Sequence, residues 1–452
     1  MEVTRTLARY VVNSKLADIP ADVRREAVRS VVNWLGCAVG SCRHEAVDCA
    51  LAGLGPFSGP RQASVLGREE KVDILLASLL NGISSHVFDF DDTHLKTIIH
   101  PAGPVASALF PLAEYMPVTG AELLHAFILG VEVECRIGNA VYPEHYEVGW
   151  HITGTAGVFG SAAACGKLLG LDEQQMTWAL GIAGTQSSGF REMFGTHCKS
   201  FHPGRAAQNG LSAALLAQKN FTSSNQVIEA KRGFANVMST KRNYAEITEN
   251  LGKTFEVSTN SYKPFACGIV IHPSIDGCVQ LKKENKLSGA EVEKVHLTVP
   301  HLVLELTGKR TPQVGLEGKF SVFHSCAVAL LFGAAGEKEY SDAMVRDPKV
   351  IAIRDRVECT IDDSLRDDEC HVELTLKDGR VLKKYVEHAI GSRERPMSDD
   401  DVNAKFHVLV DDILGQEHGE RLLKLCWSIE SLKDAAELCR QSLPAKAERR
   451  RA

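Results

Sequence analysis

The densest group of chemically capable side chains in this sequence lies between two apolar segments. The run Asp89-Phe90-Asp91-Asp92-Thr93-His94 is followed by His100-Pro101, so three carboxylates, a hydroxyl and two imidazoles share one short window. Ionisable groups enclosed by apolar sequence favour a pocket for a polar ligand over a solvated surface. If residues 89–93 are helical, Asp89 and Thr93 share one face, while the proline keeps His100 extended. The alternative interpretation is a capped helix end with surface acids.

Three further clusters carry groups that bind anions or move protons. His151 precedes a Gly/Thr-rich turn and a new helix, where backbone N–H groups can face an anion. The alternative there is a Trp–His pair packed at a helix start. Lys199 lies in the basic stretch 197–205, which is typical of a carboxylate or phosphate clamp but also fits a solvated loop. The run 262–264 (Tyr-Lys-Pro) leads to His272-Pro273 at the expected domain boundary, a place that ligands favour and that a plain linker would also explain.

No standard catalytic or metal motif accompanies these clusters in the sequence. It contains no nucleophile elbow, no phosphate-binding glycine loop and no metal-ligand spacing. The glycines at 154, 157 and 160 lack the preceding strand of a dinucleotide site, so they indicate close helix packing. The 13 cysteines include no Cys-x-x-Cys pair, which indicates reduced, buried thiols and removes the usual ligands of an iron–sulfur cluster.

Composition limits the classes of function. The 452 residues are 44% hydrophobic and 24% charged, and 51 Lys and Arg against 57 Asp and Glu give a formal charge of −6. This balance argues against a nucleic-acid-binding protein, which needs a basic field, but it permits a local cationic site for an anionic substrate. No apolar run is long enough for a membrane span, and residues 1–20 lack the apolar core of a signal peptide. We therefore expect a cytoplasmic protein without a membrane partner.

Helical periodicity dominates up to about residue 265. Apolar residues recur at helical spacing over 22–39, and similar helices are expected at 74–88, 104–115, 120–138, 156–169, 172–183 and 205–218. Their many Ala, Gly and Ser residues predict tight helix packing. After residue 270 the pattern changes: 293–299 alternates like a strand, and 371–376 with 380–386 predict a hairpin around Asp378-Gly379. Helical periodicity returns at about residue 397, so the α+β part is an insertion.

Taken in order, these clusters resemble the MmgE/PrpD family of 2-methylcitrate dehydratases, cis-aconitate decarboxylases and proteins like iminodisuccinate epimerase. The resemblance runs along nearly the whole chain, and its motifs are Asp89–Thr93 with His100-Pro101, Gly149-Trp150-His151, Lys199 with His202-Pro203-Gly204, and Tyr262-Lys263-Pro264 with His272-Pro273. It implies a mainly α fold, with a large all-helical domain built from both chain ends (1–268 and 397–452) and a smaller α+β lid domain (269–396). It also implies a homodimer that acts on a small di- or tricarboxylate without a metal or other cofactor.

Carried over motif by motif, the resemblance assigns eight site residues. The catalytic group is His151, His272, Asp89 and His100, and the substrate-binding group is Thr93, Lys199, Lys263 and His324. His324 stands where several family members have a tyrosine, so it either replaces that hydroxyl or marks another subgroup. Asp91, Asp92 and His94 are left with structural or supporting roles.

The chemistry of a citrate-like acid agrees with this inventory. Its dehydration removes a proton next to a carboxylate and expels a β-hydroxyl, and Lys199 and Lys263 would neutralise the carboxylates. A neutral imidazole suits proton abstraction near pH 7 and a protonated one suits assistance to the leaving hydroxyl, roles that we expect His151 and His272 to share in either order. Asp89 would orient a histidine, and Thr93 would hydrogen-bond a carboxylate.

The sequence therefore predicts a lyase that removes water from 2-methylcitrate or a related alkylcitrate without a metal. Two other reactions use the same groups: decarboxylation of the cis-aconitate type, and epimerisation of a small dicarboxylate by two bases. A catalytically silent helical binding protein is the alternative outside the enzyme class.

Overall fold

The chain divides into two units in the computed structural model, which describes residues 2–445; residue 1 and residues 446–452, the outer ends of the predicted helical domain, lie outside the described residues. Unit 1 consists of Met1–Val87, Asp91–Ser261 and Asp399–Ala452, and unit 2 of Phe88–Phe90 and Tyr262–Ser398. Each unit is described by itself below.

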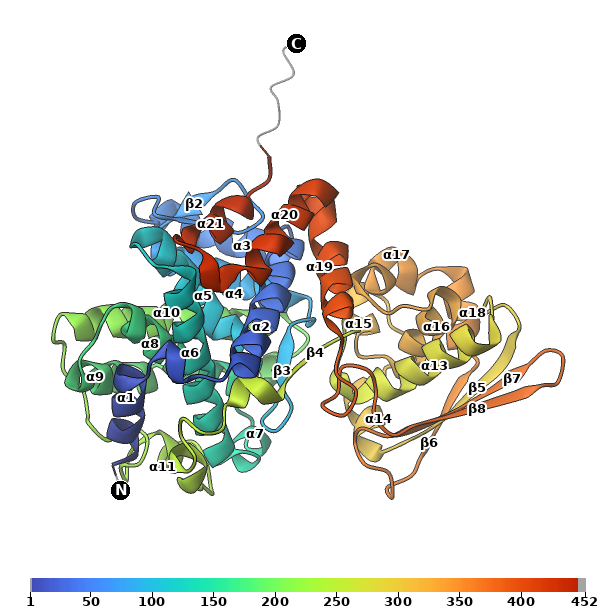
Figure 1. Ribbon diagram of the computed structural model, residues 1–452. Helices are drawn as coiled ribbons and strands as arrows, with labels where there is room; N and C mark the ends of the chain where they lie inside the picture. Colours follow the sequence, from blue (N-terminus) through green and yellow to red (C-terminus); the bar gives the residue numbers. More distant parts are fainter. Residues whose placement is uncertain (1, 446–452) are drawn as a thin grey trace, which may run out of the picture. The chain divides into compact units, whose positions relative to one another are not determined.

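Helices are the main elements of unit 1, and its strands are short (Figure 1). Its longer helices are α1 (Val3–Asn13), α2 (Ala21–Gly40), α3 (Glu45–Leu54), α4 (Ile74–Val87), α5 (Ala102–Tyr115), α6 (Gly120–Val141), α8 (Ile152–Leu168), α9 (Glu173–Gly184), α10 (His197–Gln218), α19 (Asp399–Leu414) and α20 (Gln416–Trp427). Shorter elements are α7 (Glu144–Glu147), α11 (Phe234–Val237), α12 (Ala245–Thr248), α21 (Ala436–Gln441), and the strands β1 (Ala63–Ser64), β2 (Lys71–Val72), β3 (Asp92–His94) and β4 (Asn260–Tyr262). β1 pairs with β2, and β3 with β4.

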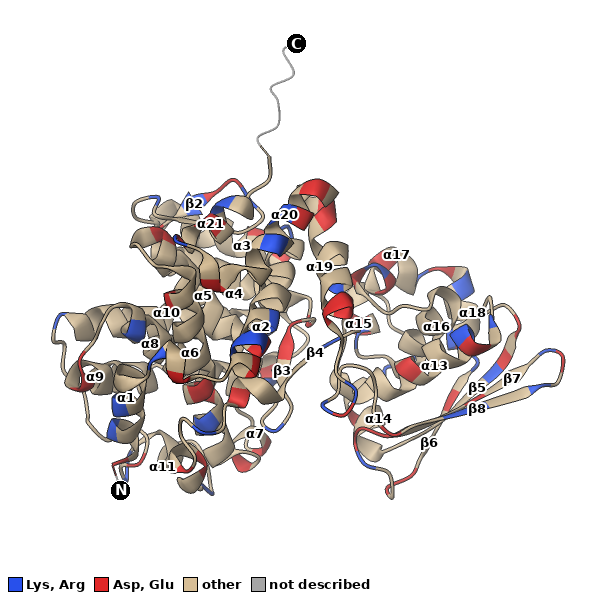
Figure 2. Cartoon of the chain, viewed as in Figure 1, with Lys and Arg blue, Asp and Glu red and all other residues tan. Residues whose placement is uncertain are grey.

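The central helices of unit 1 are almost free of charge. α4, α5 and α8 appear mostly tan in Figure 2, whereas α2 and α20 carry several coloured residues. Because apolar and small residues cover these helices on all sides, each is buried among neighbours rather than lying on the surface. A polar side chain on one of them is therefore enclosed.

The crossing of α4 and α10 is the closest approach that matters for the candidate site. A Cβ on Gly82 would lie 2.4 Å from the Cα of Gly204, and a Cβ on Gly204 would lie 2.4 Å from the carbonyl oxygen of Leu79. Only glycine permits this backbone contact, which brings the end of α4 against the start of α10.

The end of the chain returns to unit 1. α19 packs against α2, where Phe406 lies over Gly36 and Leu409 over Gly40. Lys405, which is buried, donates a hydrogen bond to the Asn33 side chain at 2.7 Å. No helix among residues 2–445 is long and apolar enough to cross a membrane.

Unit 2 combines a four-stranded sheet with helices. The strands β5 (Val292–Val299), β6 (Val357–Ile361), β7 (Cys370–Leu376) and β8 (Val381–Val386) lie in the order β6-β5-β7-β8, and only the β5–β6 pair is parallel. The helices are α13 (His272–Asn285), α14 (His301–Thr307), α15 (Gly315–Gly318), α16 (Val322–Phe332), α17 (Asp342–Val345) and α18 (Pro348–Arg354). α13 lies on β7 and β8, with Gly277 opposite Val372.

The mainly α fold, the strand near 293–299 and the hairpin around Gly379 are confirmed. The expectation of a helix over 89–93 is wrong, because Asp89 is left-handed (φ 53°) and β3 begins at Asp92. Two helices also begin earlier than expected: α8 at Ile152 and α10 at His197. The supposed turn after His151 and the supposed basic loop are the first turns of these helices.

Candidate functional site

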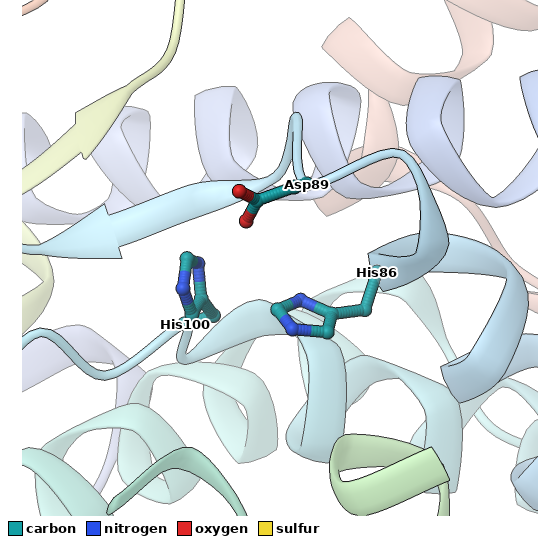
Figure 3. Close-up of side chains that lie close together, drawn as sticks. All are labelled: His86, Asp89 and His100. Atoms are coloured by element: carbon teal, nitrogen blue, oxygen red, sulfur yellow. The ribbon is translucent and has the colours of Figure 1, made fainter. Parts of the chain in front are cut away.

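A histidine that sequence reasoning missed lies at the end of α4. His86 is fully buried, and its Nδ1 donates a hydrogen bond to the equally buried Asp91 carboxylate at 2.7 Å. Its ring centroid lies 4.7 Å from that of His100, edge to face. Figure 3 shows the two rings, together with Asp89 in the loop that follows α4. In the sequence, His86 is the one ionisable residue in a helix of apolar and small residues, and nothing in that pattern separates it from an ordinary core histidine.

His100 is held in a defined orientation just before α5. Its Nδ1–H donates to the main-chain carbonyl of Asp92 at 2.7 Å, its Nδ1 lies 3.5 Å from the Asp91 carboxylate, and its backbone N–H donates to Thr153 Oγ1 at 3.1 Å. A carbonyl only accepts, so Nδ1 of His100 carries a hydrogen. Thr93, predicted to bind substrate, is buried with its hydroxyl 3.4 Å from the same Nδ1.

His151 and His202 form a direct imidazole pair. His151 is the residue before α8, its backbone N–H donates to Gly189, and its Nδ1 lies 2.8 Å from Nδ1 of His202 on α10. At this distance one Nδ1 must carry a hydrogen and the other must not. The pair therefore holds one hydrogen between its two facing nitrogens, and both rings cannot be imidazolium at once. Trp150 stacks instead on His145 and Phe190, so the predicted alternative, a Trp–His pair involving His151, does not form.

Both rings of this pair are neutral near pH 7. Burial lowers the pKa of His151 well below its usual value, and the charges of His86 and Lys199 lower it further. The same causes in the same order lower the pKa of His202 to about 4. Lys199 itself is half-buried in the first turn of α10, with its ammonium 5.5 Å from the centroid of the Phe194 ring.

The histidine cluster of unit 1 is defined here as His86, His100, His151 and His202. His86 lies 5.9 Å from His151 between ring centroids, and His151 lies 5.1 Å from His202. Sequence reasoning found two members and quoted a third, His202, without giving it a role. Nδ1 of each of the four rings is hydrogen-bonded within unit 1.

The other polar residues of the opening window support the fold. The Asp92 carboxylate accepts hydrogen bonds from Ser30 at 2.9 Å and Asn260 at 2.6 Å, and burial, followed by the charge of Asp91, raises its pKa to about 7. His94 bridges Thr97 and Glu256.

Unit 2 holds the second group of predicted site residues. Lys263 is almost fully buried, and its ammonium donates to both the carboxylate and the carbonyl of Asp89, at 2.9 and 3.0 Å. The buried Lys319 donates to the carbonyl of Phe88 and pairs with Glu337. Two ammonium groups thus fix the segment that contains Asp89, whose left-handed backbone is uncommon outside glycine.

The two remaining predicted residues of unit 2 are also buried. His272 is the first residue of α13, and its ring lies edge-on to Phe265 at 5.3 Å. His324 lies in α16, where its Nε2 donates to the carbonyl of Glu339 at 2.9 Å, and burial lowers its pKa. This bond holds the ring in the interior of unit 2, so the substrate-binding role of His324 stays a prediction.

Comparison with known proteins places the chain in a family. The profile of the MmgE/PrpD N-terminal domain matches residues 5–247, and that of the MmgE/PrpD C-terminal domain matches residues 265–429. The chain belongs to the MmgE/PrpD family. The family resemblance inferred from the polar motifs is thereby confirmed.

Curated relatives in this family are enzymes of two kinds. A cis-aconitate decarboxylase of Aspergillus terreus is 26% identical over 96% of this chain and 95% of its own length. The human cis-aconitate decarboxylase is 25% identical over 96% of this chain and 93% of its own length. A 2-methylcitrate dehydratase of Cupriavidus necator is 24% identical, over 87% of this chain and 86% of its own length.

Proposed function

We propose that this protein is a lyase that decarboxylates a small unsaturated tricarboxylate of the cis-aconitate type. The observation that carries the proposal is the His151–His202 pair. These two buried imidazoles share one hydrogen, and the charge of Lys199 acts on them. Similarity to decarboxylases over 96% of the chain ranks this reaction above the dehydration favoured by the sequence alone.

The proposed reaction needs one proton and a place for negative charge. Loss of carbon dioxide from cis-aconitate breaks the bond between a carboxyl carbon and the adjacent CH2 carbon. The electron pair of that bond forms a new C=C bond. The π electrons of the original C=C bond move to the alkene carbon beside another carboxylate, and this carbon takes up one proton. The products are carbon dioxide and methylenesuccinate. The site must therefore stabilise an enolate-like charge and deliver a single proton.

The histidine pair meets the proton requirement when substrate is bound. In the free protein both rings are neutral, because burial and neighbouring cations disfavour the imidazolium. A trianionic substrate brings negative charge close to the pair, which favours the protonated form. One of the two rings then carries the proton, and Lys199 supplies a fixed positive charge for a carboxylate. The roles of Asp89, Lys263 and His272 stay predictions from the family resemblance.

Dehydration of 2-methylcitrate is the second candidate. The dehydratase relatives favour it, and the neutral His151–His202 pair would act as the base that removes a proton next to a carboxylate. Epimerisation and a catalytically silent protein remain outcomes of the same assay. The homodimer and the cytoplasmic location expected above also stay predictions.

The test is incubation with cis-aconitate and, separately, with 2-methylcitrate in D2O, followed by mass spectrometry of the acids and measurement of released carbon dioxide. Decarboxylation should yield methylenesuccinate carrying one deuterium. His151→Gln should lower the rate by about 100-fold or more, since it removes a proton-transfer group. His301→Gln, at an exposed histidine of α14, is the matched control and should leave the rate unchanged.

Each product identifies a different reaction. Loss of water from 2-methylcitrate without carbon dioxide release from cis-aconitate would replace the proposal with the dehydratase. Deuterium uptake without mass loss in a small dicarboxylate would indicate an epimerase. Absence of all three changes with a panel of small acids would refute the enzyme assignment.

A further inference from the structure

His86 and Asp91 form a dyad that the proposed reaction does not yet use. Both side chains have no exposed surface, and a 2.7 Å hydrogen bond joins His86 Nδ1 to the Asp91 carboxylate. His86 Nε2 is buried without a hydrogen-bond partner among residues 2–445. An imidazole with one nitrogen fixed by a carboxylate and the other unengaged can take up or release a proton without breaking the first bond.

The fold holds this dyad against the histidine pair. His86 lies one helical turn after Gly82, and His202 lies two residues before Gly204, the glycine that meets Gly82 at the α4–α10 crossing. His86 consequently lies 5.9 Å from His151 and 4.7 Å from His100 between ring centroids (Figure 3 shows His86 and His100). The backbone contact at the two glycines leaves little room for these rings to separate.

We propose that His86, held by Asp91, is a positioning residue that controls whether the His151–His202 pair carries a proton. A positive charge on His86 opposes a second one on the pair nearby. A negatively charged substrate would offset this opposition, so protonation of the pair would follow substrate binding. This role rests on the proposed function.

The electrostatic surroundings of His151 support this assignment. The groups that face it are His86 on α4, His100 before α5, and Lys199 and His202 on α10. Burial lowers the pKa of His151 most, and among the neighbouring charges that of His86 has the largest effect, ahead of Lys199. The same order holds for the pKa of His202. All four neighbours act in the same direction, which keeps the free pair neutral.

The test follows the titration of the histidine rings by NMR of protein labelled with 15N-histidine, in which the His151 signal is identified by its loss in His151→Gln. In His86→Gln, whose amide still donates to Asp91, the titration midpoint of the pair should rise by about one pH unit. Asp91→Asn should raise it by less, because His86 stays in place but loses the carboxylate that holds its Nδ1 proton. His94→Gln is the matched control: it removes another buried histidine paired with a carboxylate, Glu256, and should leave the midpoint unchanged.

Thermal unfolding verifies that each variant is folded. If His86→Gln does not fold, the titration of Asp91→Asn tests the proposal in its place. An unchanged midpoint in the folded variants would overturn the proposal and leave His86 with a packing role only. The readout needs no turnover: a raised midpoint in a protein that decarboxylates nothing supports the dyad's role and refutes the proposed function. An unchanged midpoint in an active decarboxylase refutes the dyad's role and supports the proposed function.

Discussion

At the scale of single residues, the interior of unit 1 keeps several ionisable groups uncharged. Isolated buried charges are costly, so such groups change protonation instead. Burial lowers the pKa values of His151 and His202 and raises that of Asp92 to about 7. These shifts act on stability in opposite directions as the pH changes.

The direction in which Asp92 changes stability with pH depends on whether the folded or the unfolded state binds more protons. Its pKa is raised in the folded state, so between about pH 4 and pH 7 the folded protein holds a proton that the unfolded chain has lost. Stability therefore falls as the pH rises through this range and levels off above it. For the histidines, whose pKa values are lowered, stability is full above about pH 6.5 and is lost as the pH falls.

Asp92→Asn should weaken the fall in stability that the natural protein shows between about pH 4 and pH 7. The variant has no carboxyl proton to lose, so its unfolding free energy should change less between pH 4.5 and 7 than that of the natural protein, by up to about 3 kcal/mol. Urea unfolding at several pH values measures the difference. Parallel curves for the two proteins would contradict the assignment of a protonated Asp92 at pH 5.

At the scale of elements, the crossing of α4 and α10 decides where the histidines lie. Gly82→Ala should destabilise the protein by about 2 kcal/mol or more, because the new methyl group would lie 2.4 Å from the backbone of Gly204. The same change should disturb the His86–His151 spacing and hence activity.

Gly53→Ala provides the matched control for that substitution. Gly53 also lies in a helix, α3, but a Cβ there meets no atom within 4 Å, so this variant should be as stable as the natural protein or slightly more stable. Equal stability of both variants, compared by urea unfolding, would show that the crossing has room that the structure does not indicate.

Elements were predictable where periodicity is long and were misjudged where a local signal opposed it. α2 and α4 were placed nearly to the residue. α10 was begun too late because Pro203 suggests a boundary, yet this proline lies inside the helix. His86 was missed because its role comes from Asp91 and from a contact with another helix, and neither has a periodic signature.

At the scale of the whole molecule, unit 1 is completed by the end of the chain. α19 covers α2, and a Cβ on Gly36 would lie 3.1 Å from the ring of the buried Phe406. The prediction that the chain returns to a helical domain near residue 397 rested on helical periodicity, on the capping-box spacing of Ser398 and Asp401, and on the family resemblance. The pairing of α19 with α2 lay beyond the sequence, because it depends on contacts between positions far apart in the chain.

Phe406→Ala should cost about 3–5 kcal/mol of unfolding free energy, since it opens a cavity between α19 and α2. Val408→Ala, two residues away on the exposed side of α19, should stay within about 0.5 kcal/mol of the natural protein. Chemical unfolding followed by tryptophan fluorescence reports on this region, because Trp34 lies in α2. A small effect at Phe406 would mean that unit 1 does not depend on the returning helices.

The contact between the Nδ1 atoms of His151 and His202 has one more consequence, for how such a protein can change over generations. The protonation of each ring depends on the other: one Nδ1 can donate only because the other Nδ1 accepts. A lineage that replaced one of them would lose the shared hydrogen together with the ring, and a surviving partner would be left as an isolated buried base. Selection for the shared hydrogen would therefore act on both positions together, although they lie 51 residues apart in the chain.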